Sequence, residues 1–212
     1  MRQTKAETER TKTALLDAAE ILFWEQGAAR TAVLDIARKA GLTRGAFYHH
    51  FKDKAAVFAA LIERGRVPQE EDVQRIAERG DVDALAMLRA SCRGAFELFA
   101  EDKVRQRMFG IVMHRRESLG DLEKLAEARR REMFRSSEAF ERLLKKARKA
   151  GQLSEKWTPS VAAMTLYSAI MGLLDQWIRN PDSFDIRKLG IDCIDQLLTS
   201  FTKEPTHNRR RT

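Results

Sequence analysis

The segment that most constrains the fold of this chain runs from Ala32 to Lys54 and reads AVLDIARKAGLTRGAFYHHFKDK. Its first part has apolar residues on one side and basic residues on the other, as a short amphipathic helix does. A turn follows at Gly41, and a second short helix is predicted to begin at Thr43. Two helices joined by a short turn that contains glycine form a helix-turn-helix, which places its second helix in the major groove of DNA. The segment therefore predicts DNA reading rather than catalysis.

The remainder of the chain also reads as helical. Prolines and glycines are few, and no segment shows the sustained alternation of a β-strand. The predicted fold class is all-α, with an N-terminal three-helix head joined to a larger helical bundle. The expected domains are a head at 1–54, a body at 55–203 and a basic tail at 204–212 that has little to bury. Helices are predicted at about 6–26, then the two short helices of the motif, then one from near 53 that could continue to about 79, and further helices at about 83–100, 104–115, 121–150, 159–179 and 185–202.

Composition narrows the partners. The net charge of +8 favours a polyanion, although a basic balance also serves solubility. Cys92 and Cys193 lie in separate apolar segments without metal-ligand spacing, so we expect no disulfide, metal or cofactor and a reducing compartment. The N-terminus has no signal-peptide pattern, and the apolar run 161–174 is shorter than a membrane span. We therefore expect a cytoplasmic protein without a membrane partner.

The predicted second helix of the motif carries side chains suited to DNA. Arg44 lies in its first turn, where the planar guanidinium can bind O6 and N7 of one guanine; the alternative is an ordinary surface arginine. Thr43 can cap the helix and offer its hydroxyl to a phosphate oxygen. Tyr48 and His49 lie on the same side as Arg44 and suit phosphate, sugar or a thymine methyl group. Two small residues after Arg44 let the helix approach the bases: Gly45 and Ala46.

The pattern T-x-x-x-x-IA-x-x-AG-x-T-RGAFY-x-HF-x-x-K, from Thr31 to Lys54, resembles the TetR family of one-component repressors. Within that family it is similar to the multidrug-efflux repressors of the AcrR/TtgR type. The resemblance implies that Lys54 binds a DNA phosphate. The family usually has serine or threonine where this chain has Ala32, to cap the next helix and contact phosphate. Alanine can do neither, so Thr31 or the backbone is expected to take over that contact.

The resemblance also implies a homodimer on a palindromic operator, joined through a four-helix bundle of the last two helices. A head this small reads only a few base pairs, and a symmetric dimer doubles them. The last two predicted helices carry apolar residues such as Leu173, Trp177, Ile194 and Leu198. An apolar stripe of this kind is equally expected in an internal core, so the residues alone do not decide between the two.

Polar residues set among apolar ones in the body predict a site for a hydrophobic or aromatic effector. Apolar pockets with a few polar groups suit such ligands, and methionine and aromatic side chains accommodate many shapes. His114 also matches a ligand-contacting histidine of the resembled repressors. The alternative is that these side chains form ordinary core. The expected effector residues are Cys92, Phe96, Gly110, His114, Ser137, Tyr167, Met171 and Asp175.

These features predict a ligand-responsive transcriptional repressor, of a multidrug-efflux operon by the resemblance, that hydrophobic small molecules release from DNA. One alternative is a TetR-type regulator that responds to a metabolite such as a fatty-acyl thioester. A helical enzyme is disfavoured because the sequence has no glycine-rich phosphate loop, no HExxH and no clear Ser/His/Asp set. A constitutive architectural DNA binder, which would need no effector, remains the third alternative.

Overall fold

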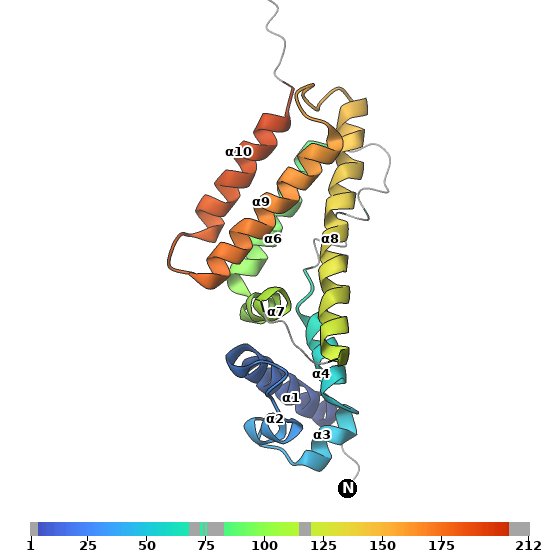
Figure 1. Ribbon diagram of the computed structural model, residues 1–212, viewed down its shortest axis with the longest axis vertical. Coiled ribbons are helices and arrows are strands. Elements are labelled where there is room, and N and C mark those ends of the chain that lie inside the picture. The colour runs from blue at the N-terminus through green and yellow to red at the C-terminus, as the bar shows by residue number, and fades with distance from the viewer. Residues whose placement is uncertain (1–3, 68–72, 74, 76–82, 115–119, 204–212) are drawn as a thin grey trace, which may run out of the picture. The chain divides into compact units, whose positions relative to one another are not determined.

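The computed structural model of the chain describes residues 4–67, 73, 75, 83–114 and 120–203 (Figure 1). Within these residues the regular structure is helical, and extended pairing is limited to one isolated bridge between Leu153 and Thr202. This confirms the all-α prediction. The predicted tail 204–212 and part of the predicted helix 53–79 lie outside the described residues.

The helices follow the predicted order closely, and most boundaries agree to within a residue or two. The last predicted helix is two elements, a π-helical segment η1 followed by α10. The bounds are α1 Lys5–Gln26, α2 Val33–Lys39, α3 Arg44–His50, α4 Lys54–Arg64, α6 Ala84–Glu101, α7 Lys103–His114, α8 Gly120–Lys149, α9 Pro159–Arg179, η1 Ile186–Gly190 and α10 Ile191–Phe201.

Side-chain caps fix where several helices begin. The hydroxyl of Thr43 accepts the backbone N–H of Ala46 at the start of α3. Asp53 caps α4 in the same way, and Thr158 caps α9 ahead of Pro159. Such caps satisfy backbone donors that have no partner within the helix. They explain why the sequence predicted these starting points correctly.

Helix α4 is shorter than the sequence predicted. It ends at Arg64 with Gly65 as its C-cap, whereas the apolar pattern allowed it to continue to about residue 79. Pro68 accounts for the difference, because a proline disfavours the helical conformation of the residue before it. Residues 66 and 67 accordingly leave the helical conformation.

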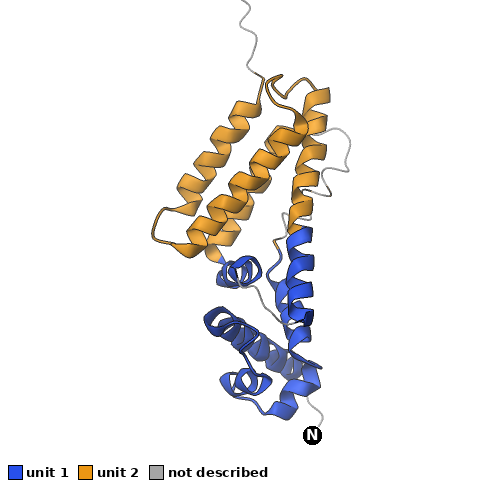
Figure 2. Ribbon diagram, viewed as in Figure 1, with its two compact units in different colours: residues 1–66, 102–132 blue, residues 67–101, 133–212 orange. Residues whose placement is uncertain are grey.

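The chain forms two compact units (Figure 2). Unit 1 comprises residues 1–66 and 102–132, and unit 2 comprises residues 67–101 and 133–212. The predicted domains follow chain order, whereas unit 1 is built from two separate segments. Each unit has its own fully buried side chains. Those of unit 1 include Leu15, Phe23, Phe47, Phe58 and Ile111, and those of unit 2 include Leu88, Phe96, Leu143, Leu166 and Phe201.

Helix α9 has the length and apolar composition that a membrane-spanning helix also needs. The sequence analysis expected no membrane-spanning helix because the apolar run 161–174 is too short. The whole of α9 is longer than that run, so the argument from length does not exclude a membrane-spanning helix. Within unit 2, α9 buries Ala162, Ala163, Leu166 and Trp177 and packs against α10 and η1. Core helices of soluble proteins share this length and composition, although only 22% of the apolar window of α9 is buried.

Candidate DNA-binding surface and effector residues

The recognition helix α3 is anchored by aromatic residues on its inner side. Phe47 is fully buried, and Phe51, just after the helix, is 5% exposed with its ring 5.9 Å from that of Phe47. Helix α3 packs on α1 and α2 through this side. Because Phe47 faces inward, Arg44, Tyr48 and His49 lie on the opposite side and are exposed. The sequence therefore places a polar, outward-facing helix on a rigid base.

Arg44 and Tyr48 form a pair on that outer face. The guanidinium carbon lies 5.5 Å from the centroid of the Tyr48 ring, and Nη2 lies 3.5 Å from the phenolic oxygen. A cation over an aromatic ring at this distance is attracted by the ring's negative face. The contact reduces the freedom of the Arg44 fork before any ligand arrives. A preorganised guanidinium loses less entropy when it forms paired hydrogen bonds.

Nothing in the described fold requires a glycine at position 45. A Cβ added to Gly45 would meet only the Thr43 hydroxyl, at an ordinary contact distance of 3.8 Å. By contrast, Gly41 has a φ of 69°, which explains its place in the turn of the motif. The missing side chain at Gly45 therefore leaves open space on the outward face of α3.

Thr31 lies inside the head rather than on its surface. Its side chain is buried, and its hydroxyl donates to the Gly27 carbonyl at 2.8 Å and accepts from Nε2 of Gln26 at 3.2 Å. At the start of α2 the Asp35 carboxylate accepts the N–H of Ala32 at 3.1 Å. The expectation that Thr31 binds phosphate in place of Ala32 is therefore not retained.

Lys54 bonds to the backbone of the turn between α1 and α2. Its ammonium donates to the carbonyl oxygens of Ala28, of Ala29 at 3.1 Å and of Thr31 at 2.9 Å. An ammonium has three protons, so these acceptors can engage all of them. The lysine that the family resemblance assigned to phosphate thus joins the first turn of α4 to the segment before α2. A DNA phosphate would have to compete with these carbonyls.

The two histidines of α3 differ in their surroundings. His49 is exposed, and its ring meets that of His50 edge to face at 5.2 Å. Burial lowers the pKa of His50, and the charges of His49 and Lys12 lower it further. Both effects favour the neutral form of His50. Among the described residues, no cluster of histidine, cysteine or acidic side chains has the arrangement of a metal site.

The predicted effector residues are divided between the two units. Gly110 and His114 lie in the last turns of α7, in unit 1; Gly110 is buried and His114 half-buried. The other six belong to unit 2: Cys92 and Phe96 on α6, Ser137 on α8, and Tyr167, Met171 and Asp175 on α9.

Some of the unit 2 residues have defined partners. The Tyr167 ring stands edge-on to Phe134, with centroids 5.6 Å apart, and the Ser137 hydroxyl donates to the Phe134 carbonyl at 2.7 Å. Asp175 accepts from Nε of Arg179 at 3.0 Å. Phe134 itself is 45% exposed. An exposed aromatic beside a half-buried tyrosine is a contact surface suited to an apolar ligand.

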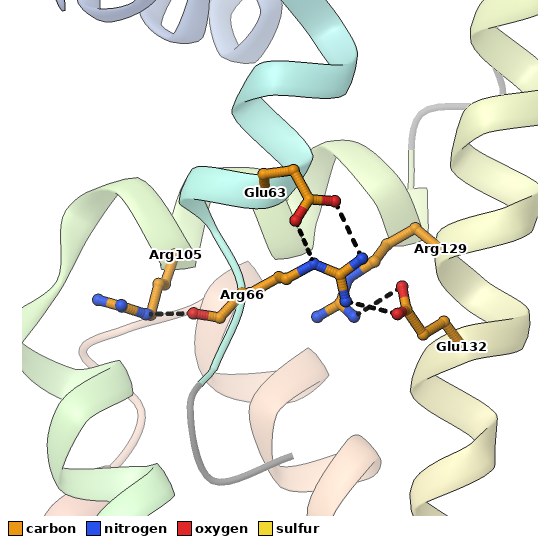
Figure 3. A network of polar contacts seen from close by, with 5 residues as sticks. All are labelled: Glu63, Arg66, Arg105, Arg129 and Glu132. Atoms are coloured by element: carbon orange, nitrogen blue, oxygen red, sulfur yellow. Dashed lines mark hydrogen bonds and ion pairs between the residues drawn. The ribbon is translucent and has the colours of Figure 1, made fainter. Parts of the chain in front are cut away.

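The structure also reveals charged contacts in unit 1 that sequence reasoning missed. The carboxylate of Glu20 on α1 is 2% exposed and accepts from Nη1 of Arg107 on α7 at 2.6 Å. A second group joins the end of α4 to α7 and α8 (Figure 3). These partners are separated by 39 to 87 residues in the chain, so no local pattern indicates them.

Comparison with known proteins establishes the class. Residues 15–61 match the family described as bacterial regulatory proteins, tetR family, and residues 83–203 match the C-terminal region of MAATS-type transcriptional repressors. The chain belongs to the TetR family and is a transcriptional regulator, not an enzyme. This confirms the resemblance drawn from the sequence.

Individual relatives align over nearly the whole chain. The HTH-type transcriptional repressor BepR of Brucella suis biovar 1 (strain 1330) is 37% identical over 202 residues, which are 95% of this chain and 96% of BepR. The crystal structure of NalD, the secondary repressor of the MexAB-OprM multidrug efflux pump in Pseudomonas aeruginosa, superposes with a TM-score of 0.78 at 31% identity, covering 95% of this chain and all of NalD. The complex of SmeT with triclosan gives a TM-score of 0.77 at 32% identity and covers 92% of both chains. SmeT is the repressor of the Stenotrophomonas maltophilia multidrug efflux pump SmeDEF.

Proposed function

We propose that this regulator represses a multidrug-efflux operon by binding a palindromic operator as a homodimer, and that hydrophobic or aromatic small molecules release it. The observation that carries the DNA-binding half is the outward face of α3, where Arg44, Tyr48 and His49 are exposed on an aromatic base. The efflux assignment is supported by relatives such as NalD and SmeT, which repress efflux pumps. A cytoplasmic location follows from this function.

In the proposed complex Arg44 reads a guanine and its neighbours fix the register. The Arg44 fork suits O6 and N7 of one guanine, while Thr43, Tyr48 and His49 contact phosphate, sugar or a thymine methyl group. The open space at Gly45 is filled by DNA, which approaches α3 more closely than a side chain there would allow. Ala46 is half-buried and adds little bulk.

A dimer is supported by apolar side chains that the single chain leaves at its surface. Val161 and Met164 on α9 are 54% and 45% exposed, and Leu189 in η1 is 49% exposed. Val161 and Met164 are three residues apart on α9 and therefore share one helical face, which we propose that a second subunit covers. Of the residues that the sequence analysis named for this surface, Trp177, Ile194 and Leu198 are buried within the single chain, so the proposed interface rests on Val161, Met164 and Leu189 instead.

The proposed effector contacts in unit 2 are the six residues predicted there from the sequence together with the exposed Phe134, and Gly110 and His114 are proposed as effector contacts in unit 1. The competing fatty-acyl proposal differs in ligand chemistry, because a thioester of coenzyme A carries phosphates as well as an acyl chain. Triclosan, present in the SmeT complex, is a suitable first probe, and stearoyl-CoA represents the alternative. Release of DNA by the second compound alone would favour the metabolite-sensing alternative.

Selection of binding sites from random duplexes tests the DNA-binding proposal. The expected result is an inverted repeat, with the centres of its two half-sites separated by about one helical turn of DNA or by a multiple of it. The selected sequence should also occur upstream of an efflux operon. Recovery of sequences without two-fold symmetry would contradict the palindromic operator, and uniform recovery of all sequences would favour an architectural binder.

A further inference from the structure

Arg66, two residues after the end of helix α4, binds a network of charged groups in unit 1 (Figure 3). Arg66 donates from Nε and Nη2 to the Glu63 carboxylate at 2.7 and 2.9 Å, and from Nη1 to Oε1 of Glu132 on α8 at 2.5 Å. The other oxygen of Glu132 accepts from Arg129, which is 6% exposed, at 3.4 Å. Hydrogen bonds from Arg66 lower the pKa of Glu63, so this partner is ionised at neutral pH.

The same end of α4 is also fastened to α7. The carbonyl of Arg66 accepts from Nε of Arg105 at 2.9 Å, and Arg105 in turn pairs with Asp102. One residue earlier, a Cβ added to Gly65 would lie 2.8 Å from Cβ of Met108, closer than real side chains approach. The backbone at the end of α4 therefore touches α7 directly. Any displacement of this end has to move α7 and the part of α8 around Glu132 or break these bonds.

The network also includes the unit 1 residue at each place where the chain passes from one unit to the other. The chain crosses after residue 66, before residue 102 and after residue 132 (Figure 2). The unit 1 residues at these crossings are Arg66, Asp102 and Glu132, and all three belong to the network. Every covalent path from unit 2 to the DNA-binding head therefore enters unit 1 through a member of this group.

Arg66 has two acceptors that differ in kind. Glu63 is local, three residues earlier and in the last turn of α4, whereas Glu132 is remote and lies on α8. The guanidinium can therefore keep Glu63 while it releases Glu132. Release of Glu132 with Glu63 kept would give the second of the two arrangements that coupling between distant sites requires.

We propose that Arg66 and Glu132 are positioning residues that couple the body of the protein to its DNA-binding head. The pair holds the end of α4 in one place and so narrows the orientations of the head that α4 carries. Loss of the pair lowers the fraction of molecules whose heads match the operator, which weakens apparent DNA affinity in proportion. An effector acts by favouring the arrangement without this pair, a statement that rests on the proposed function above.

A double-mutant cycle on DNA binding tests the proposal. Arg66→Gln, Glu132→Gln and the double variant are compared on the selected operator duplex by fluorescence anisotropy, well below the unfolding temperature, with and without triclosan. Arg64→Gln is the matched control. Arg64 also lies at the end of α4, and its Nη1 pairs with Asp17 on α1 at 2.5 Å, inside the head. Both substitutions remove one positive charge, but only Arg66 contacts α8.

Each single variant of the Arg66–Glu132 pair should weaken operator binding about five-fold or more, and the double variant should be no weaker than either single. The ratio of affinities with and without triclosan should fall toward one, while Arg64→Gln keeps the ratio of the wild type. A pair that only stabilises the fold would shift thermal unfolding but leave operator affinity unchanged, and that result overturns the proposal.

Two further outcomes keep the proposals separate. If triclosan fails to release the wild-type protein while the cycle on DNA affinity stays non-additive, the choice of effector is wrong and the coupling role stands. If the effects of Arg66→Gln and Glu132→Gln are additive, the two residues act independently and the coupling role is wrong. Arg66→Lys keeps the positive charge but cannot donate to both carboxylates through a planar guanidinium, so it should give an intermediate loss of operator affinity. It replaces Arg66→Gln in the cycle if that variant does not fold.

Discussion

Replacing Lys54 with methionine tests whether this lysine holds the head together or binds DNA phosphate. Methionine keeps much of the apolar stem and removes the ammonium that donates to the carbonyls of Ala28, Ala29 and Thr31. The loss of these bonds frees the turn before α2 from the first turn of α4. We therefore expect both the stability of the head and its affinity for DNA to fall.

The size of the effect follows from the number and kind of bonds. A hydrogen bond from a charged group contributes about 1.5–3 kcal/mol. Lys54 is half-buried, so in the variant water can donate some of the hydrogen bonds that the three carbonyls lose. For these three bonds together we expect a loss of about 2 kcal/mol in the free energy of unfolding, measured by urea denaturation. Lys52→Met is the control, because the Lys52 side chain is 84% exposed and its loss should cost less than about 0.5 kcal/mol.

The salt dependence of DNA binding separates the two roles. Each phosphate contact contributes about 0.9 to the slope of log affinity against log salt, so two lysines in a dimer would contribute about 1.8. Between about 50 and about 200 mM salt, such a contact would change the affinity ratio of wild type to Lys54→Met by about 12-fold. The carbonyl contacts predict instead a ratio that stays constant within about two-fold. A change near 12-fold with unaltered stability would show that Lys54 binds phosphate and would refute this reasoning.

Three further predictions concern the recognition helix, the dimer and the buried thiol. Arg44→Ala should weaken operator binding and relax one base position in each half-site, worth about 1–3 kcal/mol of discrimination; unchanged base preference in site selection would mean that Arg44 reads no base. Without DNA, sedimentation at low micromolar concentration should give twice the chain mass of 24.3 kDa, and a monomer would remove the proposed interface. Burial, and then the charge of Asp195, raise the pKa of the Cys92 thiol to about 12, so the reactive thiolate is disfavoured at pH 8. A disulfide reagent should therefore modify at most one thiol per folded chain, at Cys193, and both after denaturation; two reactive thiols in the folded protein would contradict the burial of Cys92.

The elements that the sequence predicted well are those set by local chemistry. Thr43, Asp53 and Thr158 cap helices through bonds to residues three positions away, and Gly41 forms a turn that needs a positive φ. Such contacts leave a pattern within a short stretch of sequence. The face of α3 could be predicted for the same reason, since Phe47 and its neighbours follow helical spacing.

The sequence could not predict contacts between segments that are distant in the chain. Lys54 matched a family pattern for phosphate, but its carbonyl partners lie 23 to 26 residues earlier, in a turn whose geometry depends on the packing of the whole head. Thr31 differs, because its hydroxyl bonds to a carbonyl only four residues earlier, but a bond to the backbone leaves no pattern of residue types in the sequence. The pair of Arg66 and Glu132 spans 66 residues, and charged residues on amphipathic helices usually face solvent.

The response of DNA binding to a small molecule tests the proposed function most directly. Fluorescence anisotropy of the labelled operator is measured at fixed salt with wild type and with His114→Ala, with and without saturating triclosan or another lipophilic compound. A coupling of about 1–3 kcal/mol predicts that a bound effector weakens operator binding by about 5- to 150-fold. His114→Ala should alter effector affinity and keep effector-free operator affinity. Several compounds that bind the protein but leave the DNA isotherm unchanged would contradict the proposal and favour a constitutive DNA binder.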